Sequence, residues 1–156
     1  MDVNFINPFL HSITNILVTM ATMDSQHGKI SLKKDPLASG DVTGLISMTS
    51  TNLRGSLAVS FSREVALKMT SLMLNEEVTE FGETVRDMVG EVTNMVTGGA
   101  KKLLAEKGYD FDMATPIVIM GDNHKISHSS KGQIILIPFN TEHGEFYVEI
   151  CFETNN

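Results

Sequence analysis

The sequence predicts an α+β fold in which a largely antiparallel sheet is covered on one face by long helices. Three segments carry apolar residues at helical spacing, and strand-like segments lie between the first and second of them and after the third. Because helices and strands are grouped along the chain, an antiparallel sheet is favoured over a parallel one. The 156 residues suit a single domain spanning 1–156, which can be stable without a disulfide or a metal ion.

The first part of the chain contains one predicted helix and one predicted hairpin. Residues 5–21 carry an apolar stripe at helical spacing, made of Phe5, Phe9, Ile13, Ile16, Leu17 and Met20. Residues 28–33 are consistent with a short strand. Residues 42–50 and 53–62 alternate in the manner of two strands, and the short connection between them predicts a hairpin.

Two further helices follow the hairpin. Ser62 occupies the N-cap position of the second helix, whose apolar stripe is Val65, Met69, Leu72 and Met73. The third helix is predicted for residues 79–107, because Gly108 is a common C-terminal signal. Its apolar stripe consists of Phe81, Val85, Met88, Val89, Val92, Val96 and Leu103.

Three strand-like segments, 114–120, 133–139 and 145–153, complete the chain. The second is apolar on both faces, which predicts a central strand. The third alternates, and Cys151 falls on the face opposite its apolar side chains. We expect Cys151 to be a small buried or half-buried residue, and a single cysteine excludes both an internal disulfide and a cysteine-rich zinc site.

The composition excludes several classes of partner. The formal net charge is −7 and the isoelectric point is near 5.1, which argues against nucleic acid and against a basic membrane-binding patch. The partly apolar N-terminal segment is too short and too polar to span a bilayer, and it lacks a basic start. These features predict a cytoplasmic protein.

The third helix carries a second stripe that faces away from the core. On a helical wheel Glu91, Asn94 and Gly98 fall together, about half a turn from the apolar stripe. Gly99 falls instead at the edge of the apolar stripe, where its small size would let another element pack closely. Since each interior glycine weakens a helix by roughly 1 kcal/mol relative to alanine, Gly98 favours a contact face over plain surface.

An acid and an amide on one rigid face suit a particular chemistry. Without a nearby nucleophile they cannot form a covalent intermediate, but they can hold a cation on a partner and orient a water molecule. Phosphoryl-group hydrolysis depends largely on such positioning. The alternative is that Glu91 and Asn94 are ordinary solvated residues, because Glu-x-x-Asn is a short pattern.

The stretch from Gly90 to Met95, together with Gly98, resembles the Glu-x-x-Asn signature of the CheC, CheX and FliY chemotaxis phosphatases. The segment from Leu53 to Leu74 and the order of elements are similar to this family as well, and a single clear motif makes CheX the closest member. The resemblance implies a CheC-like fold and dephosphorylation of a CheY-type receiver domain. Glu91 would pair with a receiver lysine, and Asn94 would orient the water that attacks the aspartyl phosphate.

The same resemblance implies the cofactor and the assembly. The magnesium ion belongs to the phosphorylated receiver, so the chain needs no cofactor or metal of its own, and CheX-type members are typically homodimers. We therefore expect a homodimer, with strands 133–139 and 145–153 offering edges for a second copy. Gly98 would lie where the receiver approaches.

The sequence differs from the family pattern in one respect, and two alternative functions remain open. Two-motif members carry a second Glu-x-x-Asn, whereas the first helix here offers only the segment from Ser12 to Asn15, which we interpret as a silent remnant made of surface residues. The main alternative to an enzyme is a non-catalytic module that binds a receiver or a flagellar-switch protein. A third possibility, metal hydrolysis, is prompted by Asp122, His124 and His128, although their surroundings suggest a loop or strand.

Overall fold

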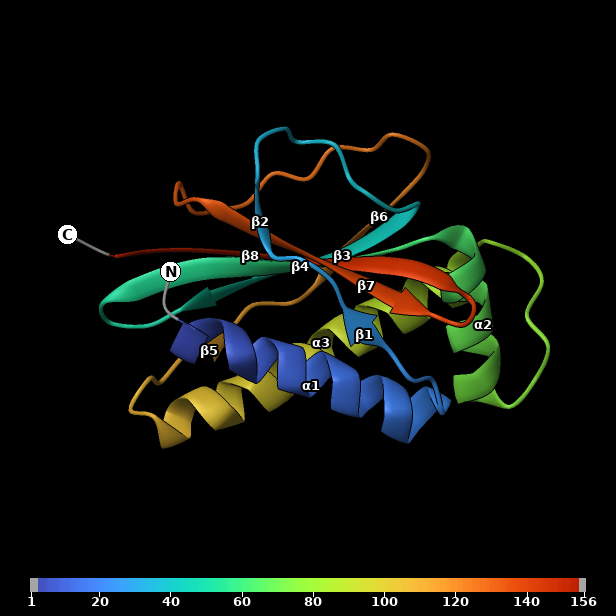
Figure 1. Ribbon diagram of the computed structural model, residues 1–156, viewed down its shortest axis with the longest axis horizontal. Helices are drawn as coiled ribbons and strands as arrows, with labels where there is room; N and C mark the ends of the chain where they lie inside the picture. The colour runs from blue at the N-terminus through green and yellow to red at the C-terminus, as the bar shows by residue number, and fades with distance from the viewer. Residues whose placement is uncertain (1–2, 155–156) are drawn as a thin grey trace.

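The computed structural model describes residues 3–154, which form one sheet with long helices on one face (Figure 1). The helices are α1 (Val3–Ala21), α2 (Arg63–Leu74) and α3 (Glu83–Glu106). The strands are β1 (Gln26–His27), β2 (Ser31–Lys33), β3 (Val42–Thr49), β4 (Leu53–Phe61), β5 (Asp112–Met113), β6 (Ile117–Met120), β7 (Ile134–Thr141) and β8 (Gly144–Thr154). The predicted α+β class, with an antiparallel sheet covered by helices, is confirmed.

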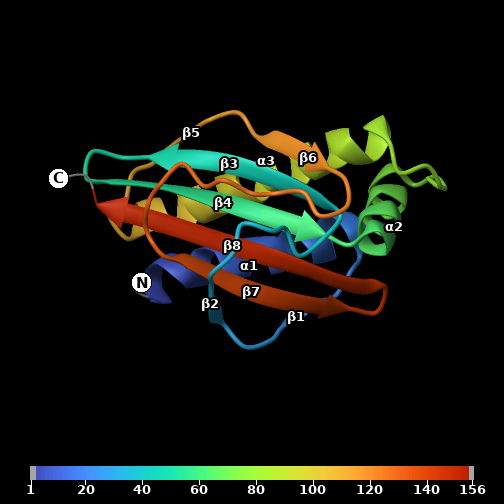
Figure 2. The same cartoon turned by 90° about the horizontal axis from the view of Figure 1, so that it is seen from above.

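All strand pairs are antiparallel, and the main path through the sheet runs β1-β7-β8-β4-β3-β5 (Figure 2). Strand β2 pairs with β7, and β6 pairs with β3. The two longest strands, β4 and β8, occupy the middle and pair from Leu53↔Thr154 to Phe61↔Phe146. Residues 133–139, predicted to form a central strand, fall in β7, which pairs with β8 on one side and only with the short β1 and β2 on the other.

Three boundaries differ from expectation, and the first is that only Ile117–Met120 of the predicted strand 114–120 is a strand. The predicted strand 28–33 is interrupted, so only Ser31–Lys33 pairs with β7, while β1 precedes it. Helix α3 begins at Glu83 and not near residue 79, since Gly82 occupies the N-cap and no side chain caps it. The preceding loop is ordered instead by Ser71, whose Oγ accepts from Val78 N at 3.0 Å. Ser62 does cap α2, accepting from Val65 N at 3.4 Å.

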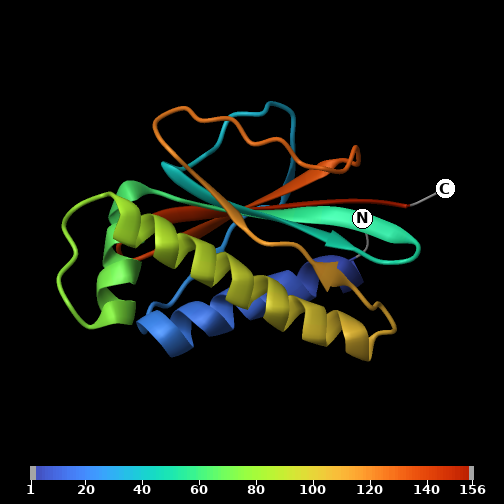
Figure 3. The ribbon, with the colours of Figure 1, turned by 180° about the vertical axis from the view of Figure 1, so that it is seen from behind.

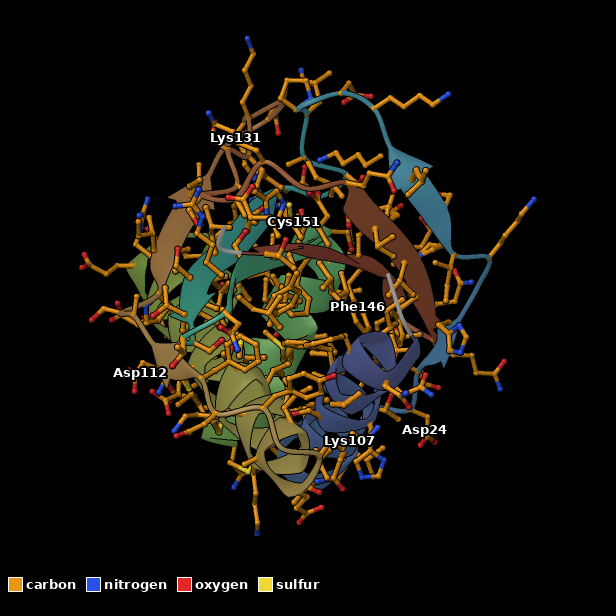
Figure 4. The ribbon with its side chains drawn as sticks, turned by 90° about the vertical axis from the view of Figure 1, so that its left-hand side faces the viewer. Asp24, Lys107, Asp112, Lys131, Phe146 and Cys151 are labelled. Carbon is orange, nitrogen blue, oxygen red and sulfur yellow. The ribbon has the colours of Figure 1, made fainter. Side chains whose placement is uncertain are left out.

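The core lies between the sheet and the helices. The inward residues of β4 and β8 pack against α1 and α3, and Phe139 and Phe146 stack with ring centroids 4.6 Å apart. Figure 4 shows Phe146 on this side of the sheet and Cys151 on the other. Cys151 is buried, as expected, and its sulfur accepts from Ser130 Oγ at 2.9 Å. On α3 the buried residue of the last turns is Leu104, whereas the predicted Leu103 is only half-buried.

Two glycines let α3 approach its neighbours closely. A Cβ atom at Gly99 would overlap Ser12 Oγ of α1, and a Cβ atom at Gly44 of β3 would overlap the Thr93 side chain of α3. Ser12 is buried and donates a hydrogen bond to the Val96 carbonyl oxygen at 2.7 Å. Helix α3 is therefore fixed from two sides at the level of residues 93–99.

The opposite face of the sheet is covered by residues 34–41 and 121–133, which rise above it in Figure 1. Beneath them lies a buried charged group in which Glu149 receives hydrogen bonds from Lys33 Nζ at 2.7 Å and from His128 Nε2 at 3.0 Å. These three side chains are at most 5% exposed. Ser56 Oγ lies 2.5 Å from His128 Nδ1 and completes the chain of contacts.

The buried pair predicts a strong dependence of stability on Lys33. The Lys33→Met variant leaves the Glu149 carboxylate buried without its cation, which should lower the free energy of unfolding by about 3 kcal/mol. His128 remains as a partner and limits the loss. The exposed neighbour provides a control, since Lys34→Met should change stability by less than about 0.5 kcal/mol. Urea denaturation that gives equal midpoints for the two variants would contradict this assignment.

Candidate functional site

The candidate site lies on the outer side of α3. Both Glu91 and Asn94 are exposed and one helical turn apart, and Val92, Thr93 and Val96 on the opposite side are buried. Figure 3 shows α3 in front of the other elements, with no segment drawn over its outer side. The outward position that the helical wheel predicts for Glu91 and Asn94 is thus found in the structure.

Gly98 extends the same face by one turn. A Cβ atom at this position would meet no atom within 4 Å, so the glycine leaves a patch of bare helix surface beside Asn94. Gly99, as expected, has the other role and lies against α1. The two adjacent glycines therefore serve opposite sides of the same helix.

Neither Glu91 nor Asn94 is engaged elsewhere. Within residues 3–154, no hydrogen bond or ion pair involves either side chain, and both residues are exposed to solvent. The segment 76–91 adds a local field, because it carries six acidic residues and one arginine. That arginine, Arg86, donates to the Val118 carbonyl oxygen at 2.9 Å. A partner with a basic surface is favoured at this end of α3.

A convex helix face of this kind can perform a limited set of chemical tasks. Glu91 can receive an ammonium group from a partner, and the Asn94 amide can donate one hydrogen bond and accept another, which is what orienting a water molecule requires. Both groups stand on a helix that is packed rigidly against α1 and β3. The helix can therefore hold both groups in fixed positions for a partner that approaches its outer side.

On the first helix, only one of the two residues Ser12 and Asn15 is exposed. Asn15 is exposed, but Ser12 is 4% exposed, so the prediction that both are surface residues was wrong for Ser12. Its side chain points at α3 and bonds the Val96 carbonyl, where a glutamate would collide with Gly99. Sequence reasoning missed this contact because it joins residues 84 positions apart.

The two histidines that prompted the metal hypothesis have hydrogen-bond partners within the protein. His124 Nε2 lies 2.6 Å from Thr43 Oγ1, and its Nδ1 donates to the Gly121 carbonyl oxygen at 2.7 Å. His128 is part of the buried group with Glu149. In the part of the chain that the structure describes, no three His, Cys, Asp or Glu side chains are grouped as metal ligands would be.

None of the helices within residues 3–154 is long and apolar enough to cross a bilayer.

The family of the chain follows from comparison with known proteins. The model of the chemotaxis phosphatase CheX family matches residues 42–140, which include the hairpin, α2 and the whole of α3. The chain belongs to the CheX family. The matched range contains Glu91, Asn94 and Gly98, so the candidate site lies within the family domain.

Three similar proteins illustrate the relationship. The CheY-P phosphatase CheX of Thermotoga maritima is 29% identical over 139 residues, and the match covers 88% of each chain. The crystal structure of a CheC-like superfamily protein from Shewanella sp. PV-4 has a TM-score of 0.92 at 55% identity, covering 98% of this chain and 99% of that one. The CheX-CheY-BeF3-Mg complex of Borrelia burgdorferi has a TM-score of 0.81 at 27% identity, covering 96% and 97%.

The two adjacent glycines predict opposite responses to alanine. Gly98→Ala should raise the free energy of unfolding by up to about 1 kcal/mol, because it improves helix propensity and meets no neighbour. Gly99→Ala should lower it by about 1–3 kcal/mol, because the methyl group displaces Ser12. Thermal or urea unfolding measures both. In a Ser12→Ala background, Gly99→Ala should lower the free energy of unfolding by a smaller amount. An unchanged loss would mean that the added methyl group does not clash with Ser12.

Proposed function

We infer that this chain is a phosphatase that removes the aspartyl phosphate of a CheY-type response regulator in bacterial chemotaxis. The observation that carries the inference is the exposed pair Glu91 and Asn94 on a rigid helix of a CheX-family domain. The Thermotoga relative is a CheY-P phosphatase, and the Borrelia relative forms a complex with CheY, BeF3 and magnesium. Beryllofluoride on a receiver stands in for the phosphoryl group, so that complex supports docking of an activated receiver.

The proposed mechanism assigns one role to each side chain. The Glu91 carboxylate docks on a lysine of the receiver, and Asn94 orients the water that attacks the phosphorus in line with the aspartyl oxygen. Such a reaction needs positioning and charge stabilisation more than covalent help from the protein. The magnesium ion would arrive with the receiver, so we propose that the chain holds no metal or cofactor of its own. Gly98 would leave room for the receiver backbone.

A second candidate function is a non-catalytic module that binds a receiver through the same helix face. It is separated from the phosphatase by turnover, because a binding module would protect the phosphorylated receiver while an enzyme used in catalytic amounts would exhaust it. The Thermotoga relative, which is a CheY-P phosphatase, favours the enzyme.

Removing the amide provides the decisive test. Asn94→Ala should lower phosphate release from a phosphorylated receiver about a hundredfold, since loss of a group that positions charge or water in the transition state commonly costs ~3 kcal/mol. Glu91→Ala should weaken binding of the receiver as well as slow turnover. Phosphate release is followed over time, with circular dichroism to confirm folding, and wild-type turnover by folded Asn94→Ala would refute the assignment.

We also propose that the chain forms a homodimer, although not through the strand edges first suggested. Strands β7 and β8 are each paired on both sides, so they offer little free edge. The outer strands of the described sheet are β5 and β6 at one margin and β1 and β2 at the other. A dimer that extends the sheet would therefore use one of these margins.

Light scattering tests the assembly directly. At micromolar concentration we expect about twice the 17.1 kDa chain mass. Ile117 of β6 is 62% exposed, which makes it the natural position for a disruptive charge at the β5 and β6 margin. A dimer broken by Ile117→Lys would locate the interface there, whereas a monomeric wild-type protein would refute the dimer.

A further inference from the structure

A hollow of about 370 Å³ adjoins the candidate site, between the last turn of α2 and the first turns of α3. It is lined by Leu74, Thr84, Asp87, Met88 and Glu91. Leu74 is 39% exposed, and Met88 is half-buried. The hollow thus combines an apolar floor with two carboxylates, one of which belongs to the proposed docking residue.

Asp87 lies on the same face of α3 as Glu91 and Asn94. Asp87, Glu91, Asn94 and Gly98 follow one another at spacings of four, three and four residues, so they share one face of the helix. Asp87 is exposed and lies about 6 Å from Glu91 along the helix axis. A receiver that covers Glu91 and Asn94 therefore extends over or beside the hollow.

The chemistry of the hollow selects one kind of occupant. A lysine or arginine side chain has an apolar stem that can lie on Leu74 and Met88 while its charged head reaches a carboxylate. The surrounding segment 76–91 carries six acidic residues against one arginine, so a basic surface is attracted and an acidic one repelled. Glu91 is already assigned to the lysine of the receiver active site, which leaves Asp87 for another cation.

We propose that this hollow is a specificity subsite, in which Leu74, Met88 and Asp87 hold a second basic side chain of the receiver, distinct from the lysine that pairs with Glu91. The inference rests on the proposed function, because the same receiver must occupy both positions. It assigns the choice of receiver to residues outside the Glu-x-x-Asn motif. The subsite contributes binding and leaves the attacking water to Asn94.

The test uses the receiver of the same organism charged with beryllofluoride and magnesium as the binding probe, and the phosphorylated receiver for turnover. Asp87→Asn and Leu74→Ala should each raise Kd and KM about five- to tenfold, with kcat retained at saturating receiver. Asp87→Asn should also flatten the dependence of Kd on salt, and Asp87→Glu should keep most of the affinity. Glu106→Gln, which removes an exposed acid from the far end of α3, is the matched control and should bind like wild type.

The outcomes separate this inference from the function on which it rests. If wild-type protein neither binds the charged receiver nor releases phosphate, the proposed function fails and the subsite fails with it. If wild type is active but Asp87→Asn keeps both its Kd and its salt dependence, the subsite alone is overturned. A loss with Leu74→Ala but none with Asp87→Asn would mean an apolar occupant and would equally overturn the basic one. Because both residues are exposed, we expect the variants to fold, and circular dichroism verifies this.

Discussion

The close packing of α3 between α1 and β3 determines where the candidate site lies. Gly99 brings α1 against α3 at Ser12, and Gly44 brings β3 against α3 at Thr93. The two contacts lie on the inner side of the same helical turns that carry Asn94 and Gly98 on the outer side. Because side chains at these contacts would overlap neighbouring atoms, the helix has little freedom to slide or roll, and the outer face is presented in one orientation.

The outer face was predictable because it depends on local periodicity. The positions of Glu91, Asn94 and Gly98 follow from the 3.6-residue repeat and from the apolar stripe of Val85, Val89 and Val92, which the structure confirms as buried. The Glu-x-x-Asn signature in the same stretch indicated the family to which the chain belongs. The outward position follows from residues of one helix alone, whereas the family resemblance also depends on the segment from Leu53 to Leu74 and on the order of elements.

The features that escaped prediction depend on contacts between distant parts of the chain. Ser12 looks like a surface residue in its own helix and becomes buried only because α3 packs on it. Strand β7 reads as central from its apolar sequence, yet its place is set by pairing with β8 and the short β1 and β2. Lys33, His128 and Glu149 come from three separate segments, and no sequence pattern links them. The prediction placed the start of α3 too early because Phe81 continues the apolar period of the helix. The true start follows Gly82, which has no side chain that could signal an N-cap in the sequence.

The convexity of the face that bears Glu91 and Asn94 has a consequence for selectivity. Glu91 and Asn94 stand exposed on the outer side of α3, and the hollow beside Glu91 does not extend to Asn94, so a small acyl phosphate would not be enclosed between the two side chains. The reactive centre is complete only when another folded protein supplies the phosphoryl group and its surroundings. Selectivity of this kind would come from the requirement that two folded proteins meet before the phosphoryl group is attacked.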